Sequence, residues 1–587
     1  MITSPTQADQ DLVGETTTTK KHWIDRLHDV GWTIFRHAQK HTGVGIVCSV
    51  AYFDPGNWGV DLQAGSQYGY KLLFVVLLAG LFAAFLQVLA CRLGVVTGLD
   101  LASHCRILFH DRPRHTKLWR WGVLYPLYVL AEVAIVSTDL AELLGSAIAL
   151  TLLFPALPLW AGVLVTGADV LLILALGNPL HARPVKVFEW IIAALVFSVL
   201  ICMAMIIARI SVDWGQAFIG FVPSKTLFAS GALYTSVGIL GATVMPHSLF
   251  LGSHLATQDR LSKTPLAPVS SLSDKVRERE PMRFTSRSEH LRYFGRAIWQ
   301  KCWSLFVIPR AELEALNARP KSHEHRENNA LEFVQAHVYH GMVDMVSSLL
   351  GFAVIINALI LILASAVFYY GSGAHGSESP ASLFDAHTLI NDTIGTGKSY
   401  PSGYCKLFTS LAIGAALLFA LALLAAGQSA SIVATVAGQS VSEGFLNWKV
   451  SPIVRRLVTR MLGLIPSMAV AIVVGPSGID FLLVASQVTL SIVLPFITFP
   501  LIYLTSSSRI MRVRKPSPGH PVMSPGEEGS SLPAITTLDT DPEMTQTEDF
   551  VDFSSGKIMT SLGCLIWLVI LAANVYVLVT LGMGQGG

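Results

Sequence analysis

The sequence predicts an all-α integral membrane protein with about eleven transmembrane helices, two of them broken in the middle. Of its 587 residues, 52% are hydrophobic and only 14% are charged, whereas a soluble domain carries about a quarter charged residues. The apolar residues form charge-free runs such as 72–90 and 558–582, close to the roughly 20 residues that a helix needs to cross a bilayer. Among the apolar stretches that contain a proline, 43–65 and 228–254 share an alanine four residues before it.

Each expected span is an apolar stretch close to the length of one crossing. In chain order, the spans are 43–65, 70–96, 118–147, 158–178, 185–210, 228–254, 336–370, 405–427, 457–475, 477–504 and 558–583. The seven cysteines include no Cys-x-x-Cys pair, which indicates neither a disulfide framework nor a thiolate metal site.

Lysine and arginine collect in connections that share one side of the membrane if the N-terminus is cytoplasmic. The basic clusters are at 106–120, 257–332, 455–460 and 509–515. By contrast, 371–404 contains Lys398 as its single lysine or arginine, and it carries Asn391 in an Asn-Asp-Thr pattern. This pattern is a candidate N-glycosylation site, which suits a loop outside the cytoplasm.

The same distribution divides the chain into segments. We expect a cytoplasmic N-terminal tail at 1–42, five spans in 43–210, five more in 228–504, an extracytoplasmic loop at 371–404, cytoplasmic linkers at 257–332 and 505–557, and an eleventh span at 558–583. The linkers are polar and rich in Pro and Ser, so they are expected to be largely disordered. The basic character of 257–332 either draws it to an anionic leaflet or simply follows the positive-inside bias.

The first span is broken at Asp54-Pro55-Gly56-Asn57. Proline removes a backbone donor and clashes with the preceding turn, and glycine adds conformational freedom. Backbone carbonyls freed inside a membrane are tolerated only where they line a cavity or bind something. Because an intramembrane carboxylate costs at least about 2.5 kcal/mol, Asp54 is by default a functional residue. The alternative is that it only caps the second half of the helix.

The sixth span contains a similar helix break at Ala242-Thr-Val-Met245-Pro246-His247. Like Ala51-Tyr-Phe-Asp54-Pro55, it has an alanine four residues before the proline and a candidate ligand directly before it. Matching interruptions in the two halves of a chain indicate the binding site of an inverted-repeat transporter. A single methionine in an apolar helix is usually packing, and its position equivalent to Asp54 argues for a ligand here.

The candidate ligands narrow the cargo. Asp54 offers a hard anionic oxygen, Asn57 an amide oxygen and Met245 a thioether, and the carbonyls of Ala51 and Ala242 would complete the shell. Ca²⁺ and Mg²⁺ prefer several oxygen ligands and gain nothing from sulfur. Softer divalent ions such as Mn²⁺, Fe²⁺, Co²⁺ and Cd²⁺ tolerate or prefer the thioether.

These segments resemble the natural resistance-associated macrophage protein (Nramp) family of proton-coupled divalent-metal transporters. The matching stretches are 54–57, 245–247, 427–446, 62–65 and 93–98, and their residues resemble those of fungal members. The resemblance implies two inverted five-helix repeats, with helices 1 and 6 broken, in the fold of bacterial sodium-coupled amino-acid transporters. It also implies that Asp54, Asn57, Met245 and the Ala51 and Ala242 carbonyls hold the metal.

The tenth span departs from the family pattern. Members commonly have glutamine two residues before a proline where this chain has Val493 before Pro495. Gln487 is retained, and we expect its amide to reach the ion in one conformation. Val493 puts the completeness of the occluded coordination shell in question.

Three acidic residues of the third span, Glu132, Asp139 and Glu142, fall on roughly one helical face. Together with His247 and Arg460 they are candidates for a proton pathway, with Asp139 as the leading acceptor, and the family resemblance implies the same role. A salt-bridge network that packs the third span against the ninth is the alternative for Glu132 and Arg460. His247 is equally compatible with a neutral, hydrogen-bonded core residue.

The expected function is secondary active transport of Mn²⁺ or Fe²⁺, with Cd²⁺ and Co²⁺ as further candidates, toward the cytoplasm by proton symport and alternating access. We expect no enzyme activity, no cofactor besides the transported ion, no nucleic-acid partner and a monomer in the plasma, vacuolar or endosomal membrane. The alternatives are a non-transporting metal sensor and a carrier of another solute on the same fold. The absence of a Gly-x₄-Gly-Lys-Ser/Thr motif argues against an ATP-driven pump.

Overall fold

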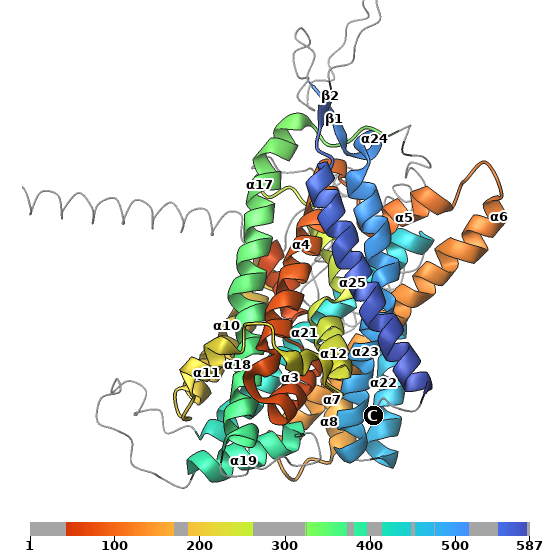
Figure 1. Cartoon of the computed structure of the whole chain (residues 1–587). Helices are drawn as coiled ribbons and strands as arrows, with labels where there is room; N and C mark the ends of the chain where they lie inside the picture. Colours follow the sequence, from red (N-terminus) through yellow and green to blue (C-terminus); the bar gives the residue numbers. More distant parts are fainter. Residues whose placement is uncertain are drawn as a thin grey trace, which may run out of the picture.

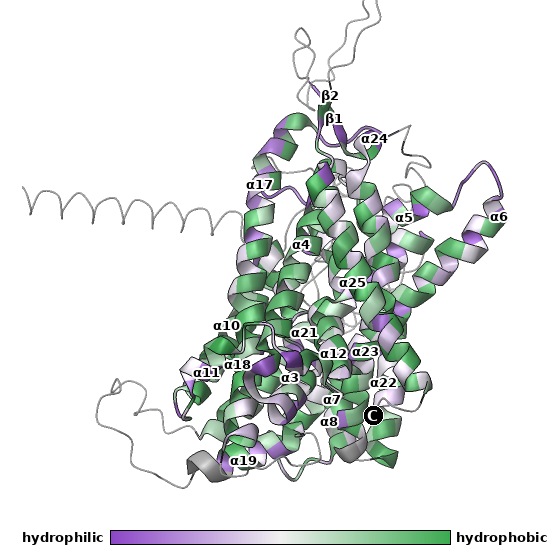
Figure 2. Cartoon of the chain, viewed as in Figure 1, coloured by the Kyte–Doolittle hydropathy of each residue, from purple (hydrophilic) through white to green (hydrophobic). Residues whose placement is uncertain are grey.

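Apolar helices make up most of the structure, a computed structural model that describes residues 43–168, 186–229, 231–261, 323, 326–371, 381–395, 414–447, 452–474, 476–515 and 550–583. The helices form a bundle, and one pair of short strands lies at one end of it (Figure 1). Apolar residues cover the middle of the bundle, and hydrophilic residues gather near α24 and the strands (Figure 2). The tail 1–42 lies outside the described residues.

The elements of the first half are α2 (Val44–Val50), α3 (Pro55–Tyr68), η1 (Gly69–Leu72), α4 (Leu73–Thr97), α5 (Leu101–Phe109), α6 (Thr116–Trp119), η2 (Arg120–Leu124), α7 (Tyr125–Leu153), α8 (Leu159–Gly167), α10 (Lys186–Ile207), α11 (Trp214–Ile219) and η3 (Lys225–Phe228). Those of the second half are α12 (Ala232–Thr243), α13 (Pro246–Leu255), α17 (Leu331–Ser348), η4 (Leu349–Val354), α18 (Ile355–Ala364), η5 (Ser365–Tyr369), α19 (Leu383–Gly395), α21 (Ala415–Leu446), α22 (Pro452–Val473), α23 (Pro476–Ser506), α24 (Ser508–Met511), β1 (Arg512–Arg514), β2 (Phe550–Asp552) and α25 (Lys557–Gly582).

Eight helical stretches of the described chain are long and apolar enough to cross a membrane. The predicted spans 70–96, 185–210, 477–504 and 558–583 agree within a few residues with α4, α10, α23 and α25. The fourth predicted span, 158–178, is described only through α8, and its remainder lies outside the described residues.

The eighth span was predicted wrongly as 405–427. The described helix α21 runs from Ala415 to Leu446, because its polar residues do not interrupt it. The hydroxyls of Ser429, Thr435 and Ser442 each donate to the carbonyl four residues earlier, at 2.8 to 2.9 Å. A hydroxyl that is satisfied within its own helix can remain at membrane depth.

Part of the predicted loop at 371–404 forms a helix, α19. Helix α19 begins with a reciprocal cap, in which the Asp385 amide donates to Ser382 Oγ at 3.0 Å and the Ser382 amide donates to Asp385 Oδ2 at 3.1 Å. Such a pair satisfies two backbone donors that a helix start leaves without partners. Asn391 is exposed on this helix.

The two predicted linkers are described at their ends. The Asn329 amide donates to Val96 O at 3.1 Å, which fixes the end of 257–332 to α4. In 505–557, β1 pairs with β2 in antiparallel register, with Val513 opposite Val551. The central parts of both linkers lie outside the described residues.

Both predicted helix breaks are present. Helix α2 ends before Ala51 and α3 begins at Pro55, whereas α12 ends before Val244 and α13 begins at Pro246. The first break sits against glycines, since a Cβ at Gly145 of α7 would overlap the Pro55 ring. Because proline has no N–H, each break leaves one carbonyl, four residues earlier, without its helical donor.

The two broken helices run in opposite directions beside each other. Asn57 of α3 meets the Ala242 carbonyl of α12, and further along α3 the Tyr68 hydroxyl lies beside Gly231 at the start of α12. As the residue number rises along α3, it therefore falls along α12. This antiparallel contact is the arrangement that the inverted-repeat prediction requires.

The eleventh helix, α25, is joined to α23 through another proline. Pro495 lies inside α23, so the carbonyl of Ser491 loses its helical partner. Asn574 of α25 donates to this carbonyl at 2.8 Å, and Trp567 Nε1 donates to Pro495 O at 2.9 Å. Two side chains of α25 thus satisfy backbone groups of α23, which positions the added helix against the bundle.

Gly241 is predicted to be a site where a single methyl group destabilises the bundle. A Cβ there would overlap Gln487 O and lie 2.7 Å from Ser491 N of α23, whereas a Cβ at Gly351 would meet nothing within 4 Å. Overpacking costs about 1–3 kcal/mol, against the roughly 1 kcal/mol that alanine gains over glycine in a helix. Gly241→Ala should lower the apparent Tm of the solubilised protein, and Gly351→Ala should leave it unchanged or raise it. Equal Tm values would contradict the tight contact between α12 and α23.

Candidate metal site

Asp54 lies at the first helix break, fully buried, directly before α3. Its Oδ1 atom accepts from the Asn57 backbone amide at 2.9 Å and from Asn57 Nδ2 at 2.7 Å. The first bond is the cap that was considered as an alternative role. Asp54 Oδ2 is buried without a hydrogen-bond partner among the described residues. Capping therefore uses one oxygen of the carboxylate and leaves the other for a ligand.

Asn57 connects the two breaks. Its Nδ2 group donates both to Asp54 Oδ1 at 2.7 Å and to the Ala242 carbonyl at 2.9 Å. Ala242 O is the carbonyl that Pro246 leaves without a helical donor. The amide NH₂ of Asn57 thus stands between two of the oxygens that were expected to bind a cation.

The remaining predicted ligands also lie at the breaks. Met245 is fully buried and directly precedes α13, with its sulfur 4.0 Å from Thr138 Oγ1 of α7. Asn357 donates to the carbonyl of Tyr52 and Trp58 donates to that of Phe53. The carbonyl of Ala51, a buried residue, is the one that Pro55 deprives of a helical donor.

Gln487 of α23 reaches the first break, as the sequence predicted. Its amide occupies the space where a Cβ at Gly56 would lie, and that same position is 3.2 Å from Asp54 Oδ2. A side chain at position 56 would displace Gln487, so the glycine allows the amide to approach the carboxylate. Gln487 Oε1 has no hydrogen-bond partner among the described residues. Val493 is buried in the same helix.

Amide and hydroxyl side chains that the sequence analysis missed support the first break. Asn357 of α18 donates to Tyr52 O at 2.7 Å and to Asn57 Oδ1 at 3.4 Å. Gln87 of α4 donates to Ser248 Oγ at 2.7 Å, and this hydroxyl donates to the Tyr52 hydroxyl at 3.0 Å. The sequence did contain a signal for these residues, namely a single amide side chain within an otherwise apolar span. Such side chains usually hydrogen-bond between helices.

Asp61 is a further buried carboxylate that the sequence analysis missed. It follows Asp54 by seven residues and Asn57 by four, so all three lie on one face of α3. Its Oδ2 atom has no hydrogen-bond partner among the described residues. The signal was present in the sequence as a second acidic residue within the first span.

Asp139 and Arg460 form a buried ion pair between α7 and α22. Arg460 Nη2 also donates to the Thr166 carbonyl of α8 at 3.2 Å. Gly463, one turn after Arg460, packs against the Asp139 carboxylate. An ion pair therefore joins the third and ninth predicted spans, as the packing alternative proposed. That alternative named Glu132 as the partner of Arg460, whereas the structure pairs Arg460 with Asp139.

The other members of the predicted proton pathway lie at different depths of α7 and α13. Glu142 is fully buried, and Gly145, one turn further along α7, packs against Pro55. His247 is buried, with Nδ1 3.4 Å from Thr138 Oγ1 and no hydrogen-bond partner for Nε2 among the described residues. Glu132 is half-buried, seven residues before Asp139 on the same helix.

The donor set limits what can bind. Among the described residues no three His, Cys, Asp or Glu side chains gather as a metal-binding group. A cation between the breaks would instead meet one carboxylate, amides, backbone carbonyls and a thioether. This neutral-rich set disfavours Mg²⁺ and Ca²⁺ and suits softer divalent ions.

Comparison with known proteins agrees with this geometry. The family model described as "Natural resistance-associated macrophage protein-like" matches residues 45–284 and 320–524. The chain belongs to the Nramp family. The match includes both helix breaks, α7, α22 and the glutamine of α23.

Among curated relatives, this Nramp chain is 37% identical to the manganese transporter pdt1 of Schizosaccharomyces pombe, over 98% of the chain and 90% of the relative. It is 35% identical to the iron transporter SMF3 of Saccharomyces cerevisiae, over 94% and 98%. Both relatives are fungal, in agreement with the resemblance of the motif residues to fungal members.

A solved structure shows the fold. The crystal structure of the Eremococcus coleocola manganese transporter matches with a TM-score of 0.62 and 26% identity, covering 92% of this chain and 86% of that one. The predicted fold class, an all-α membrane transporter fold with broken helices, is therefore confirmed.

The Asp139–Arg460 pair is predicted to contribute to stability mainly as a unit. Removing one partner leaves a buried charge, which costs about 3–5 kcal/mol, whereas replacing both costs less. Asp139→Asn and Arg460→Gln should each lower the apparent Tm strongly, and the double variant should lose less than the sum. Asp111→Asn breaks a more exposed pair with Arg120 at 2.8 Å, for which a loss of about 1 kcal/mol or less is expected. Additive effects of the two single variants would argue against coupling.

Proposed function

We propose that this protein is a secondary active transporter that moves Mn²⁺ or Fe²⁺ toward the cytoplasm together with protons. The observation that carries the proposal is the meeting of Asp54, Asn57 and the Ala242 carbonyl at the two proline breaks. Membrane-embedded carboxylates and released carbonyls are costly unless they serve a ligand. Relatives named as manganese and iron transporters support the same cargo.

Cation binding requires Asn57 to change its hydrogen bonds. Its NH₂ group is a donor and cannot ligate a metal, yet it lies between Asp54 Oδ1 and Ala242 O. Rotation of the amide by about 180° would turn Oδ1 toward this point. Asn357, 3.4 Å from Oδ1, would lose that contact. The incoming ion thus exchanges three amide hydrogen bonds for three oxygen ligands.

Selectivity follows from the ligands that do not carry charge. With Asp54 as the one carboxylate of the proposed shell, a divalent ion keeps a net positive charge and is held weakly enough to leave. Met245 offers a thioether, which Mg²⁺ and Ca²⁺ do not prefer. The Ala51 carbonyl and Gln487 complete the proposed shell, and Gln487 enters in one conformation.

Protons would follow a route beside the metal site that uses a different set of residues. Asp139 is the proposed acceptor, with Arg460 as the charge that balances it and Glu142 and His247 as neighbours nearer the breaks. The glutamate at position 132 would lie about two turns before Asp139, nearer the start of α7. Thr138 links the two routes, since its hydroxyl contacts both the Met245 sulfur and His247 Nδ1.

Transport by alternating access would move the broken helices relative to a scaffold. We place the N-terminus, both linkers and the strands on the cytoplasmic side, because α5, α24 and β1 carry basic clusters at one end of the bundle (Figure 1). The opposite end, with α19 and the glycosylation candidate Asn391, would face outward. A monomer in the plasma, vacuolar or endosomal membrane is sufficient, since every proposed ligand comes from one chain.

Metal flux into proteoliposomes tests this proposal. With Mn²⁺, Fe²⁺, Cd²⁺, Mg²⁺ and Ca²⁺ at two external pH values, we expect Mn²⁺ and Fe²⁺ uptake that rises at the lower external pH. Asp54→Ala should abolish flux, whereas Glu332→Ala, which removes an exposed carboxylate of α17, should not. Met245→Ala should admit Mg²⁺ or Ca²⁺ better, because the ligand that disfavours them is gone.

Three results would change the assignment. Mg²⁺ uptake as fast as Mn²⁺ uptake by the unmodified protein would refute selection by softness. Metal binding without flux would identify a sensor. Full pH dependence in Asp139→Asn would remove this residue as the proton acceptor.

A further inference from the structure

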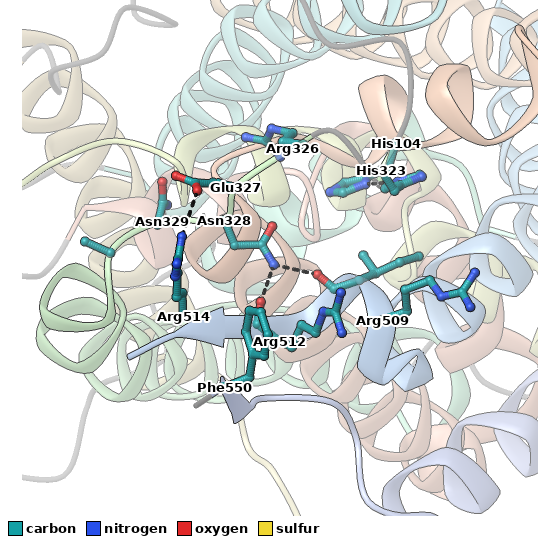
Figure 3. Close-up of a pocket in the computed structure, with 12 residues that line it drawn as sticks. His104, His323, Arg326, Glu327, Asn328, Asn329, Arg509, Arg512, Arg514 and Phe550 are labelled. Atoms are coloured by element: carbon teal, nitrogen blue, oxygen red, sulfur yellow. Dashed lines mark hydrogen bonds and ion pairs between the residues drawn. The ribbon is translucent and has the colours of Figure 1, made fainter. Parts of the chain in front are cut away.

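A polar cavity lies at the end of the bundle that carries the strands, away from the two helix breaks. It has a volume of about 690 Å³ and is lined by residues of α5, α24, β1 and β2, by His323 and by residues 326–330. Figure 3 shows four arginines directed around it, Arg326, Arg509, Arg512 and Arg514, with His104 and His323 on one wall. Neither the proposed metal route nor the proton route uses this cavity.

The wall formed by 326–330 is fixed by two consecutive asparagine side chains, Asn328 and Asn329. Asn328 Nδ2 donates to Ile510 O at 2.7 Å and to Arg512 O at 2.8 Å. Asn329 Nδ2 donates to Val95 O at 2.7 Å, at the end of α4. Segments more than 180 residues apart in the chain are thereby joined, so the cavity is a built feature of the fold.

The strand pair is fixed to the bundle in the same way. Arg92 of α4 donates to Phe553 O at 2.7 Å, just after β2. On β1, the Arg512 guanidinium lies 4.6 Å from the centre of the Phe550 ring, which orients it. The arginines of β1 therefore lie on a strand pair that is fixed to the bundle.

The charge of the lining is strongly positive. Among the described lining residues, four arginines accompany one carboxylate, Glu327, whose Oε1 is 3.6 Å from Arg514 Nη1 in an exposed pair. Such exposed pairs contribute little. Burial lowers the pKa of Arg326 to about 10, only partly offset by the nearby Asp100 carboxylate. At neutral pH Arg326 is still a cation, and its lost hydration favours an anionic partner.

The two histidines add polar groups without charge. His104 Nδ1 lies 2.9 Å from His323 Nε2, and the rings are nearly parallel. Burial lowers the pKa of His104 well below its usual range and that of His323 to about 4, with further lowering by Arg326. Both rings are therefore neutral at pH 7, and the positive charge of the cavity comes from arginine.

We propose that this cavity binds a phosphorylated inositol group, as carried by a phosphoinositide lipid of the adjacent leaflet or by a soluble inositol phosphate. Guanidinium groups match phosphate oxygens in bidentate geometry. A cavity of 690 Å³ falls within the roughly 300–1,000 Å³ of small-ligand sites. Arg509 and Arg512 follow directly after α23, where a basic pocket meets lipid headgroups.

Another source of negative charge exists in the chain itself. Residues 516–549, which connect β1 to β2 and lie outside the described residues, contain Asp and Glu but no Lys or Arg. Phosphate is favoured over these carboxylates because four arginines line one cavity, and a phosphate group offers more negative charge and more acceptor oxygens to them than a single carboxylate does. The experiment includes the linker as a competing occupant.

Binding to the purified full-length protein tests the proposal. The probes are short-chain phosphatidylinositol 4,5-bisphosphate, inositol 1,4,5-trisphosphate and inorganic phosphate, in detergent at fixed salt. We expect the first to bind, and Arg509→Gln/Arg512→Gln to weaken it at least about tenfold, since charge-assisted hydrogen bonds are lost. These two arginines are exposed, so the double variant should fold. Arg326→Gln is a second, more buried variant, and an unchanged Tm shows that each is folded.

Arg114→Gln/Lys117→Gln is the matched control, because it removes two exposed cations near the start of α6, outside the cavity lining. It should leave probe affinity unchanged. Tighter binding of the lipid than of inositol trisphosphate identifies the membrane as the source, whereas equal binding identifies the soluble headgroup, and both support the proposal. Three results overturn it: no binding of either inositol probe, equal weakening by the control, or binding that occurs only after the acidic residues of 516–549 are neutralised. Metal flux is measured separately, so failure here leaves the proposed transport untouched.

Discussion

The structure depends on carbonyls that prolines release inside the membrane. Pro55, Pro246 and Pro495 each deprive the carbonyl four residues earlier of its helical donor. Asn57 takes the Ala242 carbonyl and Asn574 takes that of Ser491. Hydrocarbon offers no substitute partner, so the released carbonyls of Ala242 and Ser491 each fix a contact between helices. The candidate site and the docking of α25 are two results of this one constraint.

The metal site is built around Asn57 as much as around Asp54. The amide holds the two half-helices together by donating to oxygens of both breaks, and a cation would bind the same oxygens. In the proposed transport, ion entry and reorganisation of the contact between α3 and α12 would therefore be the same event. This coupling gives a physical reason for a substrate to bias the conformation of a broken-helix transporter.

Arginine has two distinct uses in this molecule. Arg460 is buried within the bundle and paired with Asp139, where its charge is balanced by a specific partner. The arginines of α24 and β1 lie at the end of the bundle around a polar cavity. The first arrangement is expected of a charge at membrane depth, and the second of a surface that receives an anion.

The sequence by itself determined the membrane fold class, the positions of both breaks and the residues at them, because proline acts locally and long apolar runs need no partner to be recognised. Tertiary structure decided the rest. It extended α21 through Ser429 and Thr435, whose hydroxyls bond within the helix, and it ordered the linker ends through Asn328 and Asn329. It also assigned Asn357 to the first break and assembled the arginine cavity. These outcomes depend on contacts between segments far apart in the chain, and the spacing of residues along a sequence carries no information about them.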